Sequence, residues 1–312
     1  MPEGTAFEVS KSVRTLLAAD SNLPAAVARS LVEALPNLTE LSMLVADNAT
    51  VVTIAKLTPN LLRCTLTGLT EVVSATTATA ACAHWSLLQY LALYKQHQCA
   101  CSEDALLVLV QDLPNLQFLR LIKSTMTRDN PAPAFKPAST DGELTSKLVD
   151  LQTGFMSVAT LQRVLAVCPA LHTLHLCWPD AHIEPHDPEL FSALYNTTVS
   201  TLLVENCMVN DEDLLTIRNM EHLFLIAACG HFPSSALEGM AVQNVNLRAF
   251  YLSSSPLLAN YSYIRTILKF CPQLGTLVVA SEDCDMNAYS PIHHALYQMI
   301  QEFYPNVHSV RI

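Results

Sequence analysis

Hydrophobic residues recur along this chain in the spacing L-x-x-L-x-L, which ends in the apolar–polar alternation of a strand with one buried face. Leu116, Leu119 and Leu121 follow this spacing. We find eleven such segments in one register, whose middle apolar positions are 41, 64, 91, 119, 151, 174, 202, 223, 250, 277 and 310. The ten steps cover 269 residues, so the period is near 27 residues and leaves room for a helix after each strand.

A proline stands two residues before the first apolar position in six of these segments. The six are Pro36, Pro59, Pro114, Pro169, Pro272 and Pro305. Because proline cannot continue a helix and restricts the backbone around it, we expect each one to end a helix and to lead the chain into the strand in an extended conformation.

Helices are predicted between the strands where capping residues precede an apolar run. The predicted ranges are 105–112 after Ser102-Glu103-Asp104, 189–195 after Asp187-Pro188, 214–219 after the acidic run that begins at Asn210, 263–270 and 292–303. Amphipathic patterns over 7–19 and 24–35 predict two more helices. We expect residues 1–35 to form an N-terminal helical cap that covers the first repeat of a domain spanning residues 36–312.

A long step, of 32 residues between positions 119 and 151, contains several prolines that a helix cannot accommodate. We therefore predict a Pro-rich loop over residues 124–146. This loop is either an arm that orders on a partner or a tolerated surface insertion.

Two segments carry a family resemblance, Cys168 to Leu176 (CPALHTLHL) and Cys271 to Val279 (CPQLGTLVV). They resemble the cysteine-containing and ribonuclease-inhibitor-like leucine-rich repeats, in the form found in F-box proteins with leucine-rich repeats. The resemblance implies an α/β leucine-rich-repeat solenoid, or horseshoe, of about eleven strand–helix units with strands on its concave face. It also implies protein binding, often as the substrate receptor of a ubiquitin ligase, although residues 1–35 contain no F-box that we can identify.

The composition supports a protein-binding role. Hydrophobic residues make up 51% of the chain and charged residues only 14%, so much of its surface is expected to pack between repeats or against other proteins. The 17 basic and 28 acidic residues give a formal charge of -11, and the basic residues form no run. This charge argues against a nucleic-acid partner and favours a basic protein partner.

Neither secretion nor membrane insertion is predicted. Residues 1–7 contain Glu3 and no apolar run, so we expect the cytosol or the nucleus rather than a secretory route. The uncharged segment 72–94 is long enough to cross a bilayer, but its many polar side chains disfavour insertion. The ten cysteines stand mostly in apolar contexts, as buried free thiols would, and not in a disulfide framework.

No catalytic motif of a hydrolase, kinase or dinucleotide-binding enzyme is present, so we predict that the chain is not an enzyme and holds no cofactor. The best metal candidate combines thiols and imidazoles at Cys82, His84, His97, Cys99 and Cys101. Their spacing matches no standard zinc motif, and we predict no metal. Cys177 lies two residues from His175 on one strand face, which by itself provides no activating hydrogen bond, so we expect an inert thiol.

Side chains that flank the middle apolar position should point away from the core and form the binding face. Two aromatic groups lie there, and His175 shares the face; the predicted contact residues are Tyr90, Tyr94, Phe118, Arg120, His175, His222, Phe224 and Tyr251. Tyrosine, arginine and large apolar side chains are favoured at interfaces. The alternative is that these aromatics only pack on one another across strands. We predict a non-catalytic interaction scaffold or a subunit of a large assembly, and as the alternative a ubiquitin-ligase receptor.

Overall fold

The computed structural model describes residues 13–18, 25–45, 47–95, 101–122, 146–154, 156–177, 189–207, 209–226, 234–253, 262–280 and 298–311. The chain divides into two compact units. Unit 1 comprises Met1–Val149 with Ala166–Ala170, and unit 2 comprises Asp150–Leu165 with Leu171–Ile312. The predicted Pro-rich loop over 124–146 lies almost entirely outside the described residues.

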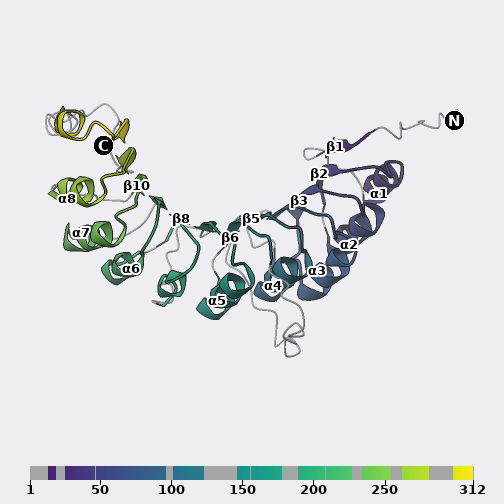
Figure 1. The fold of residues 1–312 in the computed structure, drawn as a ribbon. Coiled ribbons are helices and arrows are strands. Elements are labelled where there is room, and N and C mark those ends of the chain that lie inside the picture. Colours follow the sequence, from purple (N-terminus) through teal and green to yellow (C-terminus); the bar gives the residue numbers. More distant parts are fainter. Residues whose placement is uncertain are drawn as a thin grey trace, which may run out of the picture. The chain divides into compact units, whose positions relative to one another are not determined.

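Unit 1 contains five parallel strands that pair in chain order, with a helix between each strand and the next (Figure 1). The elements are β1 (Thr15–Ala18), α1 (Ala25–Glu33), β2 (Glu40–Leu44), α2 (Asn48–Leu57), β3 (Arg63–Leu69), α3 (Ala75–Cys82), β4 (Tyr90–Lys95), α4 (Glu103–Asp112) and β5 (Phe118–Ile122). From β2 onward the predicted middle positions lie directly opposite one another, Leu41 to Cys64, Cys64 to Leu91 and Leu91 to Leu119. The predicted register is therefore confirmed.

Unit 2 repeats this arrangement with seven strands among its described residues. The elements are β6 (Asp150–Gly154), α5 (Val158–Val167), β7 (Thr173–Cys177), the 3₁₀-helix η1 (Ser192–Leu194), β8 (Thr201–Glu205), α6 (Asp211–Thr216), β9 (His222–Ile226), α7 (Ser234–Gln243), β10 (Ala249–Ser253), α8 (Ser262–Phe270), β11 (Thr276–Ala280) and β12 (Ser309–Arg311). Its middle positions also pair in the predicted register, from Leu151 through Phe250 to Val310.

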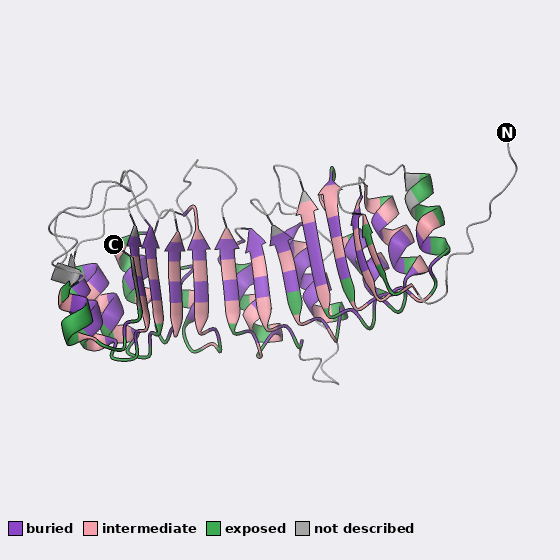
Figure 2. Ribbon diagram, turned by 90° about the horizontal axis from the view of Figure 1, so that it is seen from above, coloured by how far each residue is buried: buried purple, intermediate pink, exposed green. Residues whose placement is uncertain are grey.

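The core of each unit lies between the strands and the helices that cover one of their faces (Figure 1). Along the strands, buried and half-exposed residues alternate (Figure 2), as in Glu40–Leu44. The buried set is the leucine set of the repeat. The helices add buried residues at helical spacing, for example Val51, Ile54 and Ala55 of α2.

A tight turn joins most helices to the next strand. In it, the amide N–H of the first repeat leucine donates to the carbonyl three residues earlier, as Leu38 does to Leu35 at 3.2 Å and Leu274 to Cys271 at 3.0 Å. Proline occupies the second turn position, where its preset φ suits a type I turn. The extended conformation predicted at these prolines is wrong at Pro36, because residues 36–37 form a turn and the strand starts at Glu40.

The predicted helix over 7–19 is wrong over residues 15–18, which form β1 and pair with β2, Leu16 lying opposite Leu41. A shortened repeat pattern, Val13-x-x-Leu16-x-Ala18, is the signal that the sequence offered for this strand. Residues 7–12 lie outside the described residues. The second predicted helix, over 24–35, is α1, and the role of residues 1–35 as a cap stays a prediction.

Two other predicted helices are shorter in the structure. Only Ser192–Leu194 of the range 189–195 is helical, because Tyr195 is extended and Asn196 adopts a left-handed φ of 61°. Helix α6 ends at Thr216 rather than 219, since Ile217 is extended and Asn219 has a φ of 61°. The predicted helix starts at Ser102 and Asn210 are confirmed, with Ser102 capping α4 and a capping box joining Asn210 to Asp213.

The predicted helix over 263–270 is α8, and of the range 292–303 the described residues 298–303 are helical. Parallel strands in a single register, with helices along one face of the strands and the repeated leucine positions buried, make this an α/β leucine-rich-repeat solenoid. The repeat subtype stays a prediction.

The uncharged segment 72–94 is divided between α3 and β4. No helix among the described residues has the length and apolar character needed to span a bilayer. All seven described cysteines are free; Cys177 is half-buried and the others are buried.

Candidate binding surface on the strands

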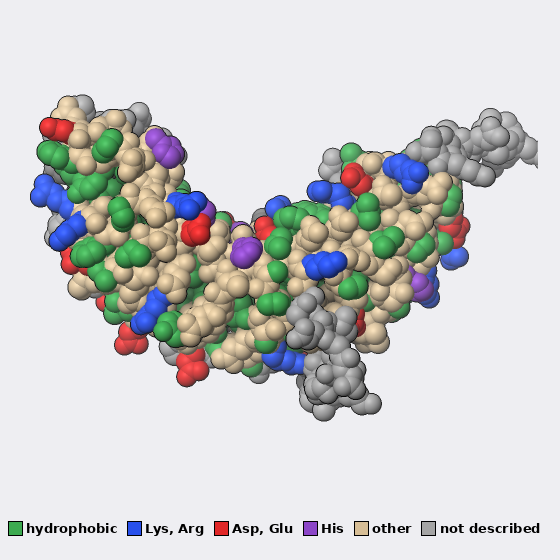
Figure 3. Space-filling model, in the orientation of Figure 1, with side chains coloured by type: hydrophobic (Ala, Val, Ile, Leu, Met, Phe, Trp, Pro, Cys, Tyr) green, Lys and Arg blue, Asp and Glu red, His purple; other side chains and the backbone are tan. Residues whose placement is uncertain are grey.

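The face of the strands opposite the helices, which we call the open face, carries the side chains that flank the middle apolar positions. These side chains are mostly half-exposed, as the alternating colours of the strands in Figure 2 show. In the view of Figure 3 the charged side chains are scattered, with apolar side chains between them. Chemical groups that gather on the open face are therefore the candidates for a binding site.

Unit 1 brings four of the predicted contact residues together with Arg63. We call Arg63, Tyr90, Tyr94, Phe118 and Arg120 the aromatic–arginine cluster. The rings of Tyr90 and Phe118, which are paired across β4 and β5, lie 6.4 Å apart between centroids. The guanidinium carbons of Arg63 and Arg120 lie 4.8 Å and 5.8 Å from the centroid of the Tyr90 ring. Tyr90 is thus in contact with two cations.

The two arginines of the cluster form no ion pair with the described residues around them. Within the described part of the chain, no carboxylate lies within ion-pair distance of Arg63 or Arg120. Glu40 lies opposite Arg63 on β2 and accepts a hydrogen bond from Thr15 at 3.4 Å, so its negative charge offsets part of the charge of Arg63 without pairing with it. The buried Nε–H of Arg120 has no hydrogen-bond acceptor.

Tyr94 completes the cluster beside Tyr90. Burial raises the pKa of the Tyr94 hydroxyl, the proximity of Tyr90 raises it further, and Arg120 partly opposes both. The hydroxyl therefore stays protonated at neutral pH and can donate a hydrogen bond. Phe118 is 36% exposed and is the most accessible apolar group of the cluster.

Unit 2 holds the other four predicted residues in two separate groups. Phe224 and Tyr251 pair across β9 and β10 with ring centroids 6.5 Å apart. His222 lies two residues before Phe224 on β9 and therefore on the same face of the strand. The Nδ1 atom of His222 lies 3.1 Å from the hydroxyl oxygen of Thr201. This geometry is the cross-strand packing that we named as the alternative to partner binding, and it carries no unpaired charge.

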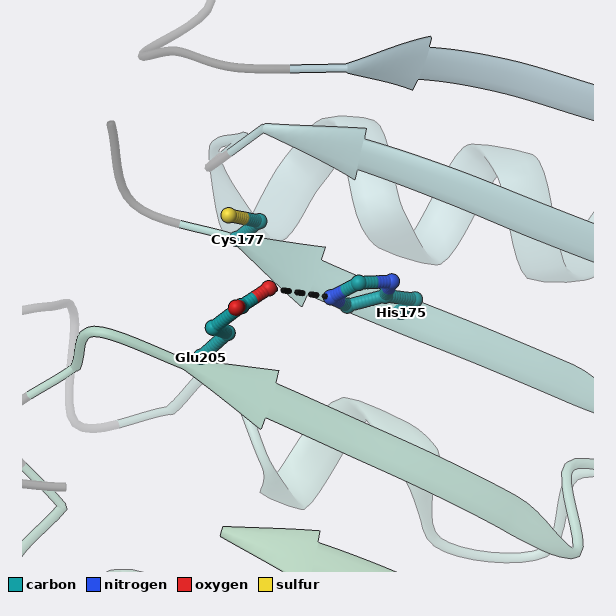
Figure 4. A group of neighbouring side chains, drawn as sticks. All are labelled: His175, Cys177 and Glu205. Carbon is teal, nitrogen blue, oxygen red and sulfur yellow. Dashed lines mark hydrogen bonds and ion pairs between the residues drawn. The ribbon is translucent and has the colours of Figure 1, made fainter. Parts of the chain in front are cut away.

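His175 does not join these aromatics. Its Nε2 atom donates to the Oε2 atom of Glu205 at 3.1 Å, and the sulfur of Cys177 lies nearby (Figure 4). The ligand-type atoms of these three side chains all lie within 4.8 Å of one another. They are the one group of this kind among the residues that the structure describes.

The candidate metal ligands predicted at Cys82 and Cys101 differ from this group in their burial and do not come together. Both thiols are buried, and burial raises the pKa of Cys82 to about 12, with a further contribution from Asp112. His97 and Cys99 lie outside the described residues. The described members Cys82, His84 and Cys101 do not form a ligand group.

Two residues that complete these groups, Arg63 and Glu205, were placed on the binding face by the repeat register but not among the contact residues. Each stands one strand away from a predicted residue, Arg63 opposite Tyr90 and Glu205 opposite Cys177. The register was the signal that could have found them, because it states which residues become neighbours across strands.

No protein family profile and no curated protein matches this sequence. Among solved structures, the chain is similar to a chain of the TLR13–ssRNA13 complex, with 15% identity, a TM-score of 0.49, and coverage of 82% of this chain and 38% of that one. It is similar to the leucine-rich-repeat-containing protein LegL7 from Legionella pneumophila, with 15% identity, a TM-score of 0.44, and coverage of 82% and 80%.

A third similar structure is a chain of the mouse RP105/MD-1 complex, with 14% identity, a TM-score of 0.38, and coverage of 88% of this chain and 39% of that one. The chain therefore spans less than half the length of the first and third structures. The strand pairing and the buried leucine positions of this chain themselves define its fold.

Proposed function

We propose that this chain is a non-catalytic protein-interaction module that binds an acidic segment of a partner protein on the aromatic–arginine cluster of unit 1. The observation that carries the proposal is the Tyr90 ring, which contacts Arg63, Arg120 and Phe118 at once on the open face. Tyrosine and arginine are the residue types that contribute most to protein interfaces.

The chemistry of the cluster suits a carboxylate flanked by apolar groups. A guanidinium can bind a carboxylate through two parallel hydrogen bonds, and neither Arg63 nor Arg120 forms an ion pair with a carboxylate among the described residues. The Tyr90 ring fixes both guanidinium groups in place, which reduces the entropy lost on binding. Phe118 offers an exposed apolar surface beside them.

The local charge leads to a different partner from the one that the net charge suggests. A formal charge of -11 favours basic partners at long range, but contact with this cluster requires negative charge. Because ion pairs act mainly within about 10 Å at ordinary salt, the local arginines decide what binds here. The proposed partner segment is therefore acidic.

An array of synthetic peptides of equal length that differ in charge and aromatic content tests this. The full-length protein should bind acidic peptides containing an aromatic residue in preference to neutral or basic ones. The double variant Arg63→Glu with Arg120→Glu should lose this binding. Each charge pair at an interface contributes about 1.5 kcal/mol or more, so the loss should exceed about tenfold for each arginine.

The matched control is Arg218→Glu, which removes another exposed arginine that lies over a tyrosine, 5.3 Å from the centroid of the Tyr195 ring in unit 2. This substitution changes the net charge by the same amount as each of the two substitutions in the double variant, and the protein should keep its peptide binding. A preference for basic peptides, or equal loss in the control and the double variant, would contradict the proposal.

A role as ubiquitin-ligase receptor stays a prediction from the family resemblance, as does membership of a large assembly. Co-purification of a ligase scaffold through residues 1–35 is the observation that would support the receptor role.

A further inference from the structure

We infer that His175, Cys177 and Glu205 form a zinc-binding site on the open face of unit 2. The inference is independent of the proposed function, because the three residues lie in unit 2 and the aromatic–arginine cluster lies in unit 1. It concerns a chemical group that the sequence pattern alone did not assemble, since Glu205 is 28 residues beyond Cys177.

The repeat geometry brings the three side chains together. His175 and Cys177 are two residues apart on β7, so both project from the same face of the strand. Glu205 lies directly opposite Cys177 on β8 and diagonally opposite His175. The close-up in Figure 4 shows the Glu205 carboxylate reaching across to the imidazole, with the Cys177 sulfur on the same strand. One nitrogen, one oxygen and one sulfur therefore meet between two adjacent strands.

The separations are near those that a zinc ion requires. Zinc binds sulfur at about 2.3 Å and nitrogen or oxygen at about 2.1 Å, so tetrahedral ligands lie about 3.4–3.7 Å from one another. The His175 Nε2 and Glu205 Oε2 atoms are 3.1 Å apart, and all three ligand atoms fall within 4.8 Å. The three ligands would surround one ion if the distance between Nε2 and Oε2 increased by a few tenths of an ångström and the cysteine sulfur moved by about 1 Å.

The donor types select the metal. A thiolate with an imidazole and a carboxylate is a combination that suits Zn²⁺, whereas Mg²⁺ and Ca²⁺ prefer oxygen ligands only. Binding requires the Cys177 thiol to release its proton to solvent and the imidazole to give up the proton on Nε2, with the remaining ring proton on Nδ1, so that Nε2 becomes the ligand. The hydrogen bond that Nε2 donates to Glu205 is replaced by two bonds to the metal.

The site is accessible from solvent but is held by the sheet. The His175 side chain is 15% exposed and the Glu205 side chain 35%, so an ion can reach both from the open face. Cys177 is the least accessible of the three, half-buried as a residue but buried within the ligand group, and Gly154, its neighbour on β6, has no side chain that could cover it. Three protein ligands leave the fourth position of a tetrahedral ion for water or for a group of a bound partner.

The experiment uses full-length protein that has been stripped of metal with a chelator. Zinc is then titrated in competition with a chromophoric chelator, and Co²⁺ is used as a spectroscopic probe. We expect one ion to bind per chain, and Co²⁺ to show the thiolate-to-metal charge-transfer band together with the visible bands of a tetrahedral site. Cys177→Ser should abolish the charge-transfer band.

His175→Gln and Glu205→Gln should each weaken zinc binding by more than about tenfold, since the loss of an outer-shell partner alone costs about 10–100-fold. The matched control His222→Gln removes another histidine of the open face and should leave the affinity unchanged. The triple variant Cys99→Ser, Cys229→Ser and Cys284→Ser, which replaces the cysteines outside the described residues, should keep the cobalt bands.

Three results would overturn the inference: no binding at one ion per chain, a charge-transfer band that survives Cys177→Ser, or equal weakening in His222→Gln and His175→Gln. Circular dichroism of each variant shows whether the fold is retained. A failure of zinc binding would leave the acidic-peptide result in unit 1 unaffected, so the two proposals can be judged separately.

Discussion

Asn244 illustrates how a single side chain connects neighbouring repeats. It is fully buried at the end of α7, where its Oδ1 atom accepts from the amide of Met220 at 2.9 Å. Its Nδ2 atom donates to the carbonyls of Ile217 and Met240 at 2.9 Å and 2.7 Å. An asparagine thus satisfies the backbone of the segment that follows α6, where the helix has ended early.

At this scale we predict that Asn244→Ala lowers the free energy of unfolding by about 2–3 kcal/mol, because it leaves buried backbone groups without partners. Urea unfolding followed by circular dichroism measures the change. Asn115→Ala is the control, since Asn115 makes comparable bonds to Ser86 and Lys147 at the surface and should lose less than about 1 kcal/mol. Equal losses in the two variants would refute the role assigned to burial.

Strand β3 shows how an element departs from the regular repeat. Its pairing with β4 shifts register between Leu66 and Leu69, and Gly68 within the shift has a φ of 73°. A Cβ atom at Gly68 would lie 2.4 Å from the Leu44 Cδ1 atom on β2. The irregular strand therefore depends on a residue without a side chain, both for its left-handed backbone and for its contact with the neighbouring strand.

At the element scale, Gly68→Ala should destabilise the protein by about 1–3 kcal/mol through backbone strain and the contact with Leu44. The control is Gly239→Ala in α7. There the new Cβ would meet only the end of the Leu215 side chain, which is 40% exposed and can move. Alanine is also more favourable than glycine inside a helix by about 1 kcal/mol. We expect Gly239→Ala to be neutral or stabilising, and thermal unfolding of both variants decides the comparison.

Across the whole molecule, buried thiols occur in both units. Burial raises the pKa of the Cys64 thiol well above its ordinary value of 9.0, and raises those of Cys168 to about 11 and of Cys271 to about 12. In the native state these groups keep their protons at pH values where the unfolded chain loses them. They couple the stability of the fold to alkaline pH.

The sign of this coupling follows from the raised pKa values. Below pH 9 the thiols are protonated in both the folded and the unfolded chain, so they cause no loss of stability. From there towards pH 12 the thiols of the unfolded chain ionise first, so the free energy of unfolding falls as pH rises. Each thiol contributes up to about 1.4 kcal/mol per pH unit. Cys64→Ala should reduce the slope by up to this amount in urea unfolding at about pH 7 and about pH 10.5. An unchanged slope would contradict the prediction.

The repeat and the strand positions that follow from it were predictable from the amino-acid sequence alone. The L-x-x-L-x-L spacing predicted the strands from Leu41 to Val310 and their register, because side chains two residues apart share a strand face. Ser102 and Asn210 marked helix starts through short-range hydrogen bonds. The aromatic residues Tyr90 and Phe118 could be assigned to one face for the same reason.

Particular side-chain contacts between strands, and strand β1, became evident from the three-dimensional arrangement of the chain. The strand β1 forms because β2 offers it an edge, which outweighed a local pattern that suggested a helix. The contacts of Arg63 with Tyr90 and of Glu205 with His175 depend on how far long side chains reach across neighbouring strands. A periodic pattern specifies which residues are neighbours, but side-chain packing and charge determine which of them meet.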